Sequence, residues 1–291
     1  MGRLLVVTGK GGVGKTVVSA ALASLLARRR RPVLLLEADP RESLHRLFGA
    51  PPSGGEVVDA APRIQLLNAS PRAILDGAVR ETLKVGALSR RVIASPIYEH
   101  FADGAPGLKE MMLLGHAMRV LDGETPPPAD DVVLDAPASG HALALLAAPL
   151  LVADAIGTGP IGRMAQRIAH FIADPKRSAV IITALAEEMA ITETLETARG
   201  LAERVGRPPA LVVVNAVTPP VPAGAPRTGP LADTIALWRA RRGAAEEALE
   251  TLAAGWDGAT ATLPLLAQEF GQGLVEEVVE ALEPQLPGKL L

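Results

Sequence analysis

The sequence predicts an α/β fold, in which a doubly wound, mostly parallel β-sheet carries helices on both faces and a helical insert. Three observations support this prediction. The chain has 291 residues, enough for one large α/β domain or two small ones. Short aliphatic runs alternate with longer amphipathic patterns, as in sheets with helical crossovers. A glycine-rich turn joins the first run to the first helical pattern. We expect one domain over residues 1–291, with the insert at approximately 70–125.

The glycine-rich turn is the most informative stretch. Residues 4–8 are predicted as a buried strand and residues 17–27 as a helix, and between them Gly9–Thr16 reads G-K-G-G-V-G-K-T. This spacing fits the phosphate-binding loop, G-x-x-x-x-G-K-[ST], in the strand-to-helix context that the motif requires. Glycines let backbone N–H groups surround a phosphate, and the helix N-terminus adds partial positive charge. The alternative is a glycine-rich turn that merely contains a lysine.

The residues of this loop take distinct roles in a nucleotide site. The predicted nucleotide-binding residues are Gly9, Lys10, Gly11, Gly12, Val13, Gly14, Lys15, Thr16 and Val17. Lys15 is expected to reach the β- and γ-phosphates, where it contributes to catalysis, and Thr16 to bind Mg²⁺ through Oγ1. ATP and Mg²⁺ are therefore the expected cofactors.

Lys10 directly follows Gly9, and with this second lysine the loop resembles the deviant Walker A motif of the ParA/MinD/ArsA/nitrogenase-iron-protein group. In that group the extra lysine crosses a dimer interface to the partner's nucleotide. The resemblance implies a catalytic role for Lys10 in a homodimer, or in a heterodimer with a paralogue. Two cations this close are costly unless an anion lies between them. A solvated loop lysine is the alternative.

Composition argues against several classes of protein. A net charge of −3 and an aromatic content of 2% argue against nucleic acid as the main partner. The absence of cysteine argues against thiolate zinc sites, iron–sulfur clusters and the cysteine pairs of some ArsA relatives. No apolar run of about 18 residues occurs, so we expect no stable membrane insertion. Without a signal peptide, we expect a cytoplasmic location.

The second predicted strand, at residues 33–36, delivers Asp39 to its carboxyl end, where open α/β sheets bind ligands. Asp39 is the predicted catalytic residue that orients the attacking water, and a water-mediated ligand of Mg²⁺. An N-cap for the next helix is the alternative. Residues 39–48 resemble switch I of the ArsA and tail-anchored-protein-targeting ATPases, D-P-A-H-S-L-x-D-x-F. Here Arg41-Glu42 replaces the usual Ala-His.

A helical block follows the strand predicted at residues 64–68. The predicted helices cover residues 73–85, 88–93 and 108–121. This block resembles the insert of ArsA-type ATPases, which forms an apolar client groove in the targeting members. One helical face carries Met111, Leu114, Met118 and Leu121. That face belongs either to the core or to a surface for an apolar client segment.

The next predicted strand, at residues 132–135, ends on Asp135 in a Walker B pattern. We expect Asp135 to hold Mg²⁺ through water, because Mg²⁺ keeps much of its hydration shell. Residues 135–141 resemble switch II of the ArsA family, D-T-A-P-T-G-H. The resemblance implies that Gly140 brings a backbone N–H close to the γ-phosphate. His141 receives no metal role, because no partner stands at ligand spacing.

The second half of the chain continues the alternation of strands and helices. Strands are predicted at 180–184, 211–215 and 260–263, and helices at 161–172, 191–205, 231–254 and 271–282. The resemblance makes Asn215 the reader of adenine, since an amide offers both a donor and an acceptor. A turn asparagine is the alternative. Pro264 and Leu265 resemble the family segment that backs the adenine. Residues 218–230 are predicted as a loop.

These motifs together resemble the ArsA and tail-anchored-protein-targeting ATPases. The resemblance implies an ATP hydrolase that closes as a dimer around Mg-ATP and thereby handles a client or partner protein. The alternative is a ParA/MinD-like positioning or signalling ATPase without an apolar client groove. An exposed apolar patch within residues 72–121 would favour client handling.

Overall fold

An eight-stranded sheet forms the centre of the computed structural model, which describes residues 2–39, 41–83, 86–137, 142–157, 159–226 and 228–290. The strand order is β3-β4-β2-β5-β1-β6-β7-β8. The strands are β1 Arg3–Thr8, β2 Val33–Glu37, β3 Val58–Ala61, β4 Ile64–Asn68, β5 Asp131–Asp135, β6 Ser178–Leu185, β7 Leu211–Val217 and β8 Thr260–Pro264. Neighbours pair in parallel except β3 and β4, which are antiparallel. The predicted doubly wound, mostly parallel α/β fold is confirmed.

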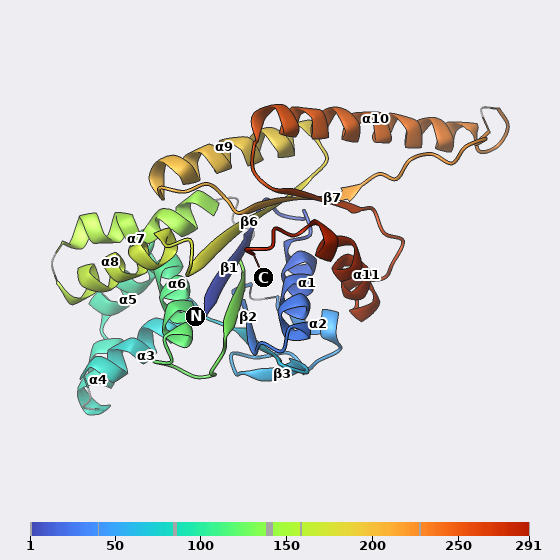
Figure 1. The fold of residues 1–291 in the computed structure, drawn as a ribbon. Helices are drawn as coiled ribbons and strands as arrows, with labels where there is room; N and C mark the ends of the chain where they lie inside the picture. The colour runs from blue at the N-terminus through green and yellow to red at the C-terminus, as the bar shows by residue number, and fades with distance from the viewer. Residues whose placement is uncertain are drawn as a thin grey trace.

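Helices cover both faces of this sheet (Figure 1). They are α1 Lys15–Arg28, α2 Leu44–Phe48, α3 Pro71–Leu83, α4 Gly86–Ile93, α5 Pro96–Gly104, α6 Leu108–Leu121, α7 Ala142–Ile156, α8 Pro160–Ala173, α9 Glu188–Arg204, α10 Ala232–Gly255, α11 Gln272–Leu282 and the short 3-10 helix η1 Glu283–Gln285. None of the helices in the described ranges is long and apolar enough to span a bilayer.

The side chains of β1 divide the core into two layers. Leu4 and Val6 belong to the layer under α6, α7 and α8, whereas Leu5 and Val7 belong to the layer under α1 and α11. Successive strand residues point to opposite faces, and here both faces are covered. The strand is therefore apolar throughout, which explains why uninterrupted aliphatic runs mark the central strands in the sequence.

Three elements differ from the sequence-based expectation. Strand β3 was not predicted, because its half-exposed residues form no apolar run at this edge of the sheet. Helix α5 was not among the predicted helices; it starts at Pro96, since Ser95 Oγ accepts a hydrogen bond from the Tyr98 N–H and proline suits the first turn. Helix α7 was not among the predicted helices either, and it accommodates Pro149 within its length.

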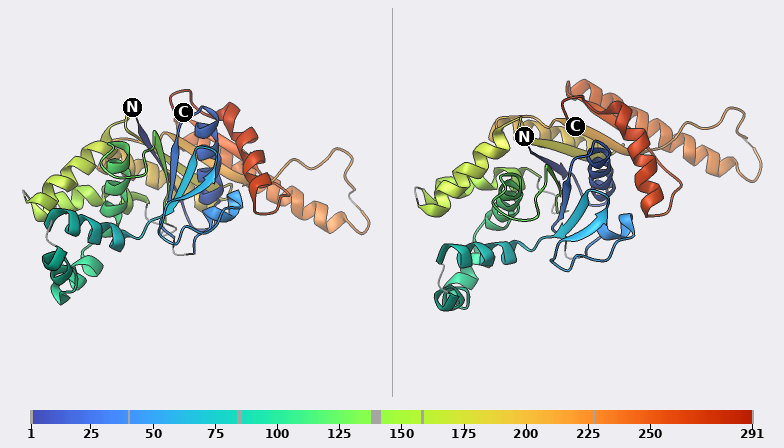
Figure 2. Two further views of the ribbon diagram at one scale, coloured as in Figure 1. Left: turned by 90° about the horizontal axis from the view of Figure 1, so that it is seen from below. Right: turned by 60° about the horizontal axis from the view of Figure 1, so that its bottom comes forward.

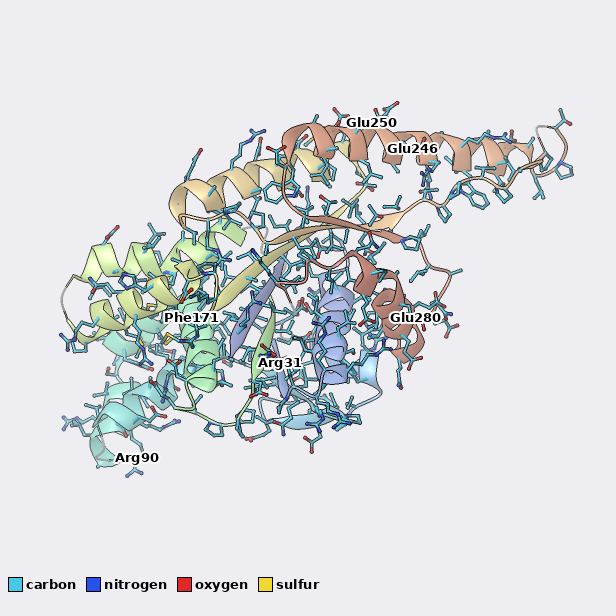
Figure 3. All side chains as sticks on the ribbon, viewed as in Figure 1. Arg31, Arg90, Phe171, Glu246, Glu250 and Glu280 are labelled. Atoms are coloured by element: carbon cyan, nitrogen blue, oxygen red, sulfur yellow. The ribbon has the colours of Figure 1, made fainter. Side chains whose placement is uncertain are left out.

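Helices α3–α6 lie between β4 and β5 in the chain and pack beside α7 and α8. The views in Figure 2 place this helical layer at one end of the molecule, while α10 and the loop before it project at the other. Glu246 and Glu250 lie along α10 (Figure 3). The face that carries Met111, Leu114 and Met118 is buried, so it belongs to the core.

Candidate functional site

The loop Gly9–Thr16 joins β1 to α1 at the carboxyl edge of the sheet. Close contacts require glycine at two of its positions. A Cβ atom on Gly9 would lie 2.1 Å from the backbone oxygen of Thr183, and Gly9 has a φ of 144°. A Cβ atom on Gly14 would lie 2.2 Å from Nδ2 of Asn215, and Gly14 has a φ of 93°. A side chain at either position would therefore clash and strain the backbone.

Lys15 is held inside this loop rather than in solvent. Its side chain is buried, and Nζ donates a hydrogen bond to the backbone oxygen of Lys10 at 2.9 Å. Burial lowers the pKa of Lys15, while attraction to Asp135 and Asp39 offsets part of that effect. A phosphate bound by the loop would stabilise the ammonium charge that burial disfavours.

Asp135 lies at the end of β5, against the first turn of α1. Its Oδ2 accepts a hydrogen bond from Thr16 Oγ1 at 2.8 Å, and its Oδ1 accepts one from Ser19 Oγ at 3.1 Å. Burial raises the pKa of Asp135 to about 6 despite these two hydroxyl donors. A cation beside this carboxylate would favour its ionised form.

The oxygen atoms of Thr16 and Asp135 fit the ligand preference of Mg²⁺. Within the described ranges, no group of three or more His, Cys, Asp or Glu side chains is arranged to hold a metal ion. A Mg²⁺ ion here would therefore also need phosphate and water oxygens, which is its usual arrangement at nucleotides.

The predicted residues from three strand ends meet at one cavity of about 430 Å³. The predicted residues that line it are Gly12, Gly14, Lys15, Thr16, Val17, Asp39 and Asp135. Its remaining lining comprises Arg41, Glu42, Ser43, Arg46, Ala136, Pro137 and Phe270. A cavity of this volume suits a small organic ligand, with the phosphate-binding loop at its base.

Asp39 is held by Arg41 on the rim of this cavity. Oδ1 of Asp39 accepts hydrogen bonds from Arg41 N at 2.9 Å and Arg41 Nε at 3.1 Å, and Oδ2 accepts one from Nη2 at 2.9 Å. These hydrogen bonds lower the pKa of Asp39. Asp39 is thus an ionised carboxylate that faces the same volume as Lys15.

The alternative role for Asp39, as the N-cap of the next helix, does not fit the structure. Helix α2 begins at Leu44, and its N-cap is Ser43. Oε1 of Glu37 accepts hydrogen bonds from Ser43 N at 2.8 Å and Ser43 Oγ at 2.7 Å. Glu37 therefore satisfies the start of α2, and Asp39 does not cap this helix.

Lys10 belongs to a second cavity, of about 330 Å³, which Gly9 and Val13 also line. Its Nζ lies 2.9 Å from Oε1 of Glu193 on α9. Gly11 is exposed in the loop and is not among the described residues that line either cavity. The loop thus turns its two lysines to different sides.

The predicted adenine-binding residues are not gathered at the cavity of Lys15. Nδ2 of Asn215 donates a hydrogen bond to the backbone oxygen of Val13 at 2.9 Å, so this amide supports the loop. Pro264 and Leu265, at the end of β8, are not among the described residues that line the cavity. Their roles toward adenine stay predictions. Gly140 and His141 lie outside the described residues.

Sequence reasoning assigned no site role to Arg41, Arg46 or Phe270, which also line this cavity. Arg41 was noticed only as a departure from the switch I pattern, and Arg46 and Phe270 were not singled out. The guanidinium carbon of Arg46 lies 5.3 Å from the centre of the Phe270 ring. These two residues are far apart in sequence and meet only because the segment before α11 reaches α2, so no local motif could have revealed the pair.

Comparisons with known proteins agree with the motifs. Residues 2–158, more than half of the chain, match the model of a family described as anion-transporting ATPases. The chain is 31% identical over 221 residues to ATPase BagA of Mycobacterium tuberculosis, covering 73% of this chain and 64% of that protein. It is 27% identical over 229 residues to an arsenical pump-driving ATPase of Acidiphilium multivorum, covering 73% and 39%. It is 29% identical over 150 residues to ATPase GET3 of Malassezia globosa, covering 51% and 43%.

The chain spans less than two thirds of the length of each of these relatives. The family match nevertheless includes the predicted phosphate-binding loop, the segments that resemble switch I and switch II, and the helical block. The resemblance drawn from those motifs is therefore confirmed.

Proposed function

Because this chain belongs to the anion-transporting ATPase family, we propose that it binds ATP with Mg²⁺ and hydrolyses the ATP to ADP and phosphate. The observation that carries the proposal is the cavity shared by Lys15, Thr16, Asp39 and Asp135. These residues follow three separate strands, yet they supply a phosphate-binding lysine, metal-binding oxygens and a carboxylate in one place.

Each residue has a role that its surroundings support. Lys15 would bind the β- and γ-phosphates, because its buried ammonium faces the cavity from within the loop. Thr16 and Asp135 would hold Mg²⁺, which neutralises phosphate charge when bound. Asp39 would orient the attacking water through its ionised carboxylate. Calorimetric titration with ATP and Mg²⁺ tests the proposal, with Lys15→Ala as the negative control.

We also propose that ATP closes the protein as a dimer, with an identical chain or a paralogue. The side chains of Lys10 and Glu193 are 58% and 42% exposed, and such an exposed ion pair contributes little to stability. Lys10 can therefore leave Glu193 and bind the more highly charged phosphates of a nucleotide on a second chain. This fits the role of the extra lysine in the group that the loop resembles.

Lys10→Ala is expected to change the ATP affinity of the isolated chain by less than about twofold while weakening ATP-dependent dimer formation by roughly tenfold or more. The reason is that Nζ of Lys10 pairs with Glu193 and does not line the cavity of Lys15. Light scattering with a slowly hydrolysed ATP analogue measures dimer formation. The variant Glu193→Gln, in which Lys10 has lost its ion pair, should form the ATP-dependent dimer at least as readily as the wild type. Equal closure by Lys10→Ala and the wild type would contradict the cross-interface role.

An apolar cavity of about 470 Å³ favours client handling over the signalling alternative. It lies among α3, α6 and α8, and its lining includes the partly buried Met112 and Met164. Flexible thioethers adapt to apolar partners of different shapes. Since a helix with side chains is about 10–12 Å wide, this volume accommodates a few apolar side chains of a client segment rather than a whole helix.

Met112→Glu is expected to weaken binding of a fluorescent apolar peptide by about tenfold, because it places a charge in the lining of this cavity. Fluorescence anisotropy measures the binding. Met189→Glu is the matched control, since Met189 is 68% exposed on α9 and is not among the described residues that line the cavity. Equal losses in both variants would exclude this cavity as the client site, and no binding by the wild type would favour the signalling alternative.

A further inference from the structure

We infer that Arg41 is a positioning residue that senses the γ-phosphate: its guanidinium holds Asp39 until ATP binds, and then exchanges Asp39 for the terminal phosphate. This inference rests on the proposed ATP hydrolysis and adds a component to it. The switch I pattern that the chain resembles has alanine at this position, so an arginine that senses phosphate is a feature of this sequence and not of the pattern.

Arg41 occupies most of the acceptor sites of the Asp39 carboxylate. Each carboxylate oxygen offers two lone pairs. Oδ1 of Asp39 already accepts hydrogen bonds from N and Nε of Arg41, at 2.9 Å and 3.1 Å, and Oδ2 accepts one from Nη2 at 2.9 Å. Arg41 therefore uses both acceptor sites of Oδ1 and one of the two on Oδ2, so most of this carboxylate becomes free to orient a water only when the guanidinium leaves.

The backbone around Arg41 is anchored, whereas its side chain is not. Nδ2 of Asn68 donates a hydrogen bond to the backbone oxygen of Asp39 at 2.8 Å. The carboxylate of Glu42 accepts one from the N–H of Ser53 at 2.7 Å. The side chain of Arg41 is 82% exposed. An exposed ion pair contributes little to stability, so the guanidinium can change partner while the segment stays in place.

The partner that competes with Asp39 for the guanidinium is the terminal phosphate of ATP. Arg41 lines the same cavity as Lys15 and Gly12 of the phosphate-binding loop. A guanidinium binds a phosphate through the same two-pronged geometry that it uses here on a carboxylate. ATP brings a terminal phosphate to this cavity and ADP does not. Exchange of partner therefore makes release of Asp39 depend on the γ-phosphate, and it places a second cation where charge develops during phosphoryl transfer.

The test compares ADP with ADP plus beryllium fluoride, which occupies the place of the γ-phosphate. Calorimetry gives both affinities in the presence of Mg²⁺, and phosphate release gives kcat and KM. Arg41→Ala is expected to lose about tenfold in affinity for the beryllium fluoride complex, with the ADP affinity within about twofold of wild type. We expect kcat to fall roughly a hundredfold or more. Arg41→Lys should keep part of the preference for the beryllium fluoride complex over ADP but little of the wild-type kcat, since lysine lacks the two-pronged guanidinium.

Arg28→Ala is the matched control, because it removes an exposed arginine that pairs with Glu283 at the far end of α1. It should match the wild type in every measurement. Equal weakening of both complexes by Arg41→Ala would reveal a merely structural role and overturn the inference, as would an unchanged preference and rate. If the wild type and Arg28→Ala bind neither complex, the proposed function itself fails.

Discussion

Lys15→Ala is expected to abolish nucleotide binding, with a loss of at least a hundredfold in affinity for Mg-ATP. Lys15 is buried in the phosphate-binding loop, and its ammonium faces the cavity where the phosphates would lie. Alanine removes this charge from a position that water reaches poorly, so solvent would not replace it. Calorimetric titration with ATP and Mg²⁺ measures the effect.

Two controls make this result interpretable. Lys109→Ala removes an exposed lysine on α6, where it contacts Asp103, and should leave the ATP affinity unchanged. Thermal unfolding without nucleotide should show that Lys15→Ala remains folded, because burial disfavours the charged lysine in the folded chain. An unchanged ATP affinity in a folded Lys15→Ala variant would refute the phosphate-loop assignment.

Asp39→Asn is expected to retain ATP binding and to lose turnover by at least roughly a hundredfold. The amide preserves the shape of the side chain, but it removes the negative charge and one of the two acceptor oxygens. Loss of a carboxylate near the phosphates also removes a repulsion, so the ATP affinity should not fall. Equilibrium binding and phosphate release, measured on the same preparation, separate the two effects.

Asp103→Asn provides the comparison for Asp39→Asn, because Asp103 is an exposed carboxylate that contacts Arg72 and Lys109. It should bind and hydrolyse ATP like the wild type. Normal turnover by Asp39→Asn would remove Asp39 from its proposed role. If Asp39→Asn retains ATP as expected, this variant is also the form with which to isolate the client or partner protein.

The candidate site could be predicted where its residues lie close together in sequence. Lys15 and Thr16 belong to one strand–turn–helix unit, and the geometry of that unit follows from the glycines between the strand and the helix. Asp39 and Asp135 each follow a buried aliphatic run, and parallel strands bring such ends to one edge of the sheet. A local pattern was sufficient in each case because every parallel strand of this fold ends at the same edge of the sheet.

Local patterns did not indicate the contacts that depend on neighbours distant in the chain. Strand β3 exists because β4 offers an edge, not because its own residues form an apolar run. Asp39 does not cap α2, because the carboxylate of Glu37 accepts the hydrogen bonds from Ser43 at the start of this helix. Asn215 supports the loop because β7 lies beside β6 and carries its amide to Val13. None of these contacts leaves a periodic signal in the sequence.

By itself, the sequence determined the class of fold, the family and the strand–turn–helix unit around the glycine-rich loop, because hydrophobic periodicity and glycine spacing are local and the backbone obeys them directly. Only the tertiary structure decided what surrounds that loop. In the folded chain Arg41 pairs with Asp39, Lys10 pairs with Glu193, and an apolar cavity forms among α3, α6 and α8. For Lys10 and for the cavity, side chains from separate helices, strands or loops come into contact only when the chain packs. The sequence of a single segment therefore does not reveal them.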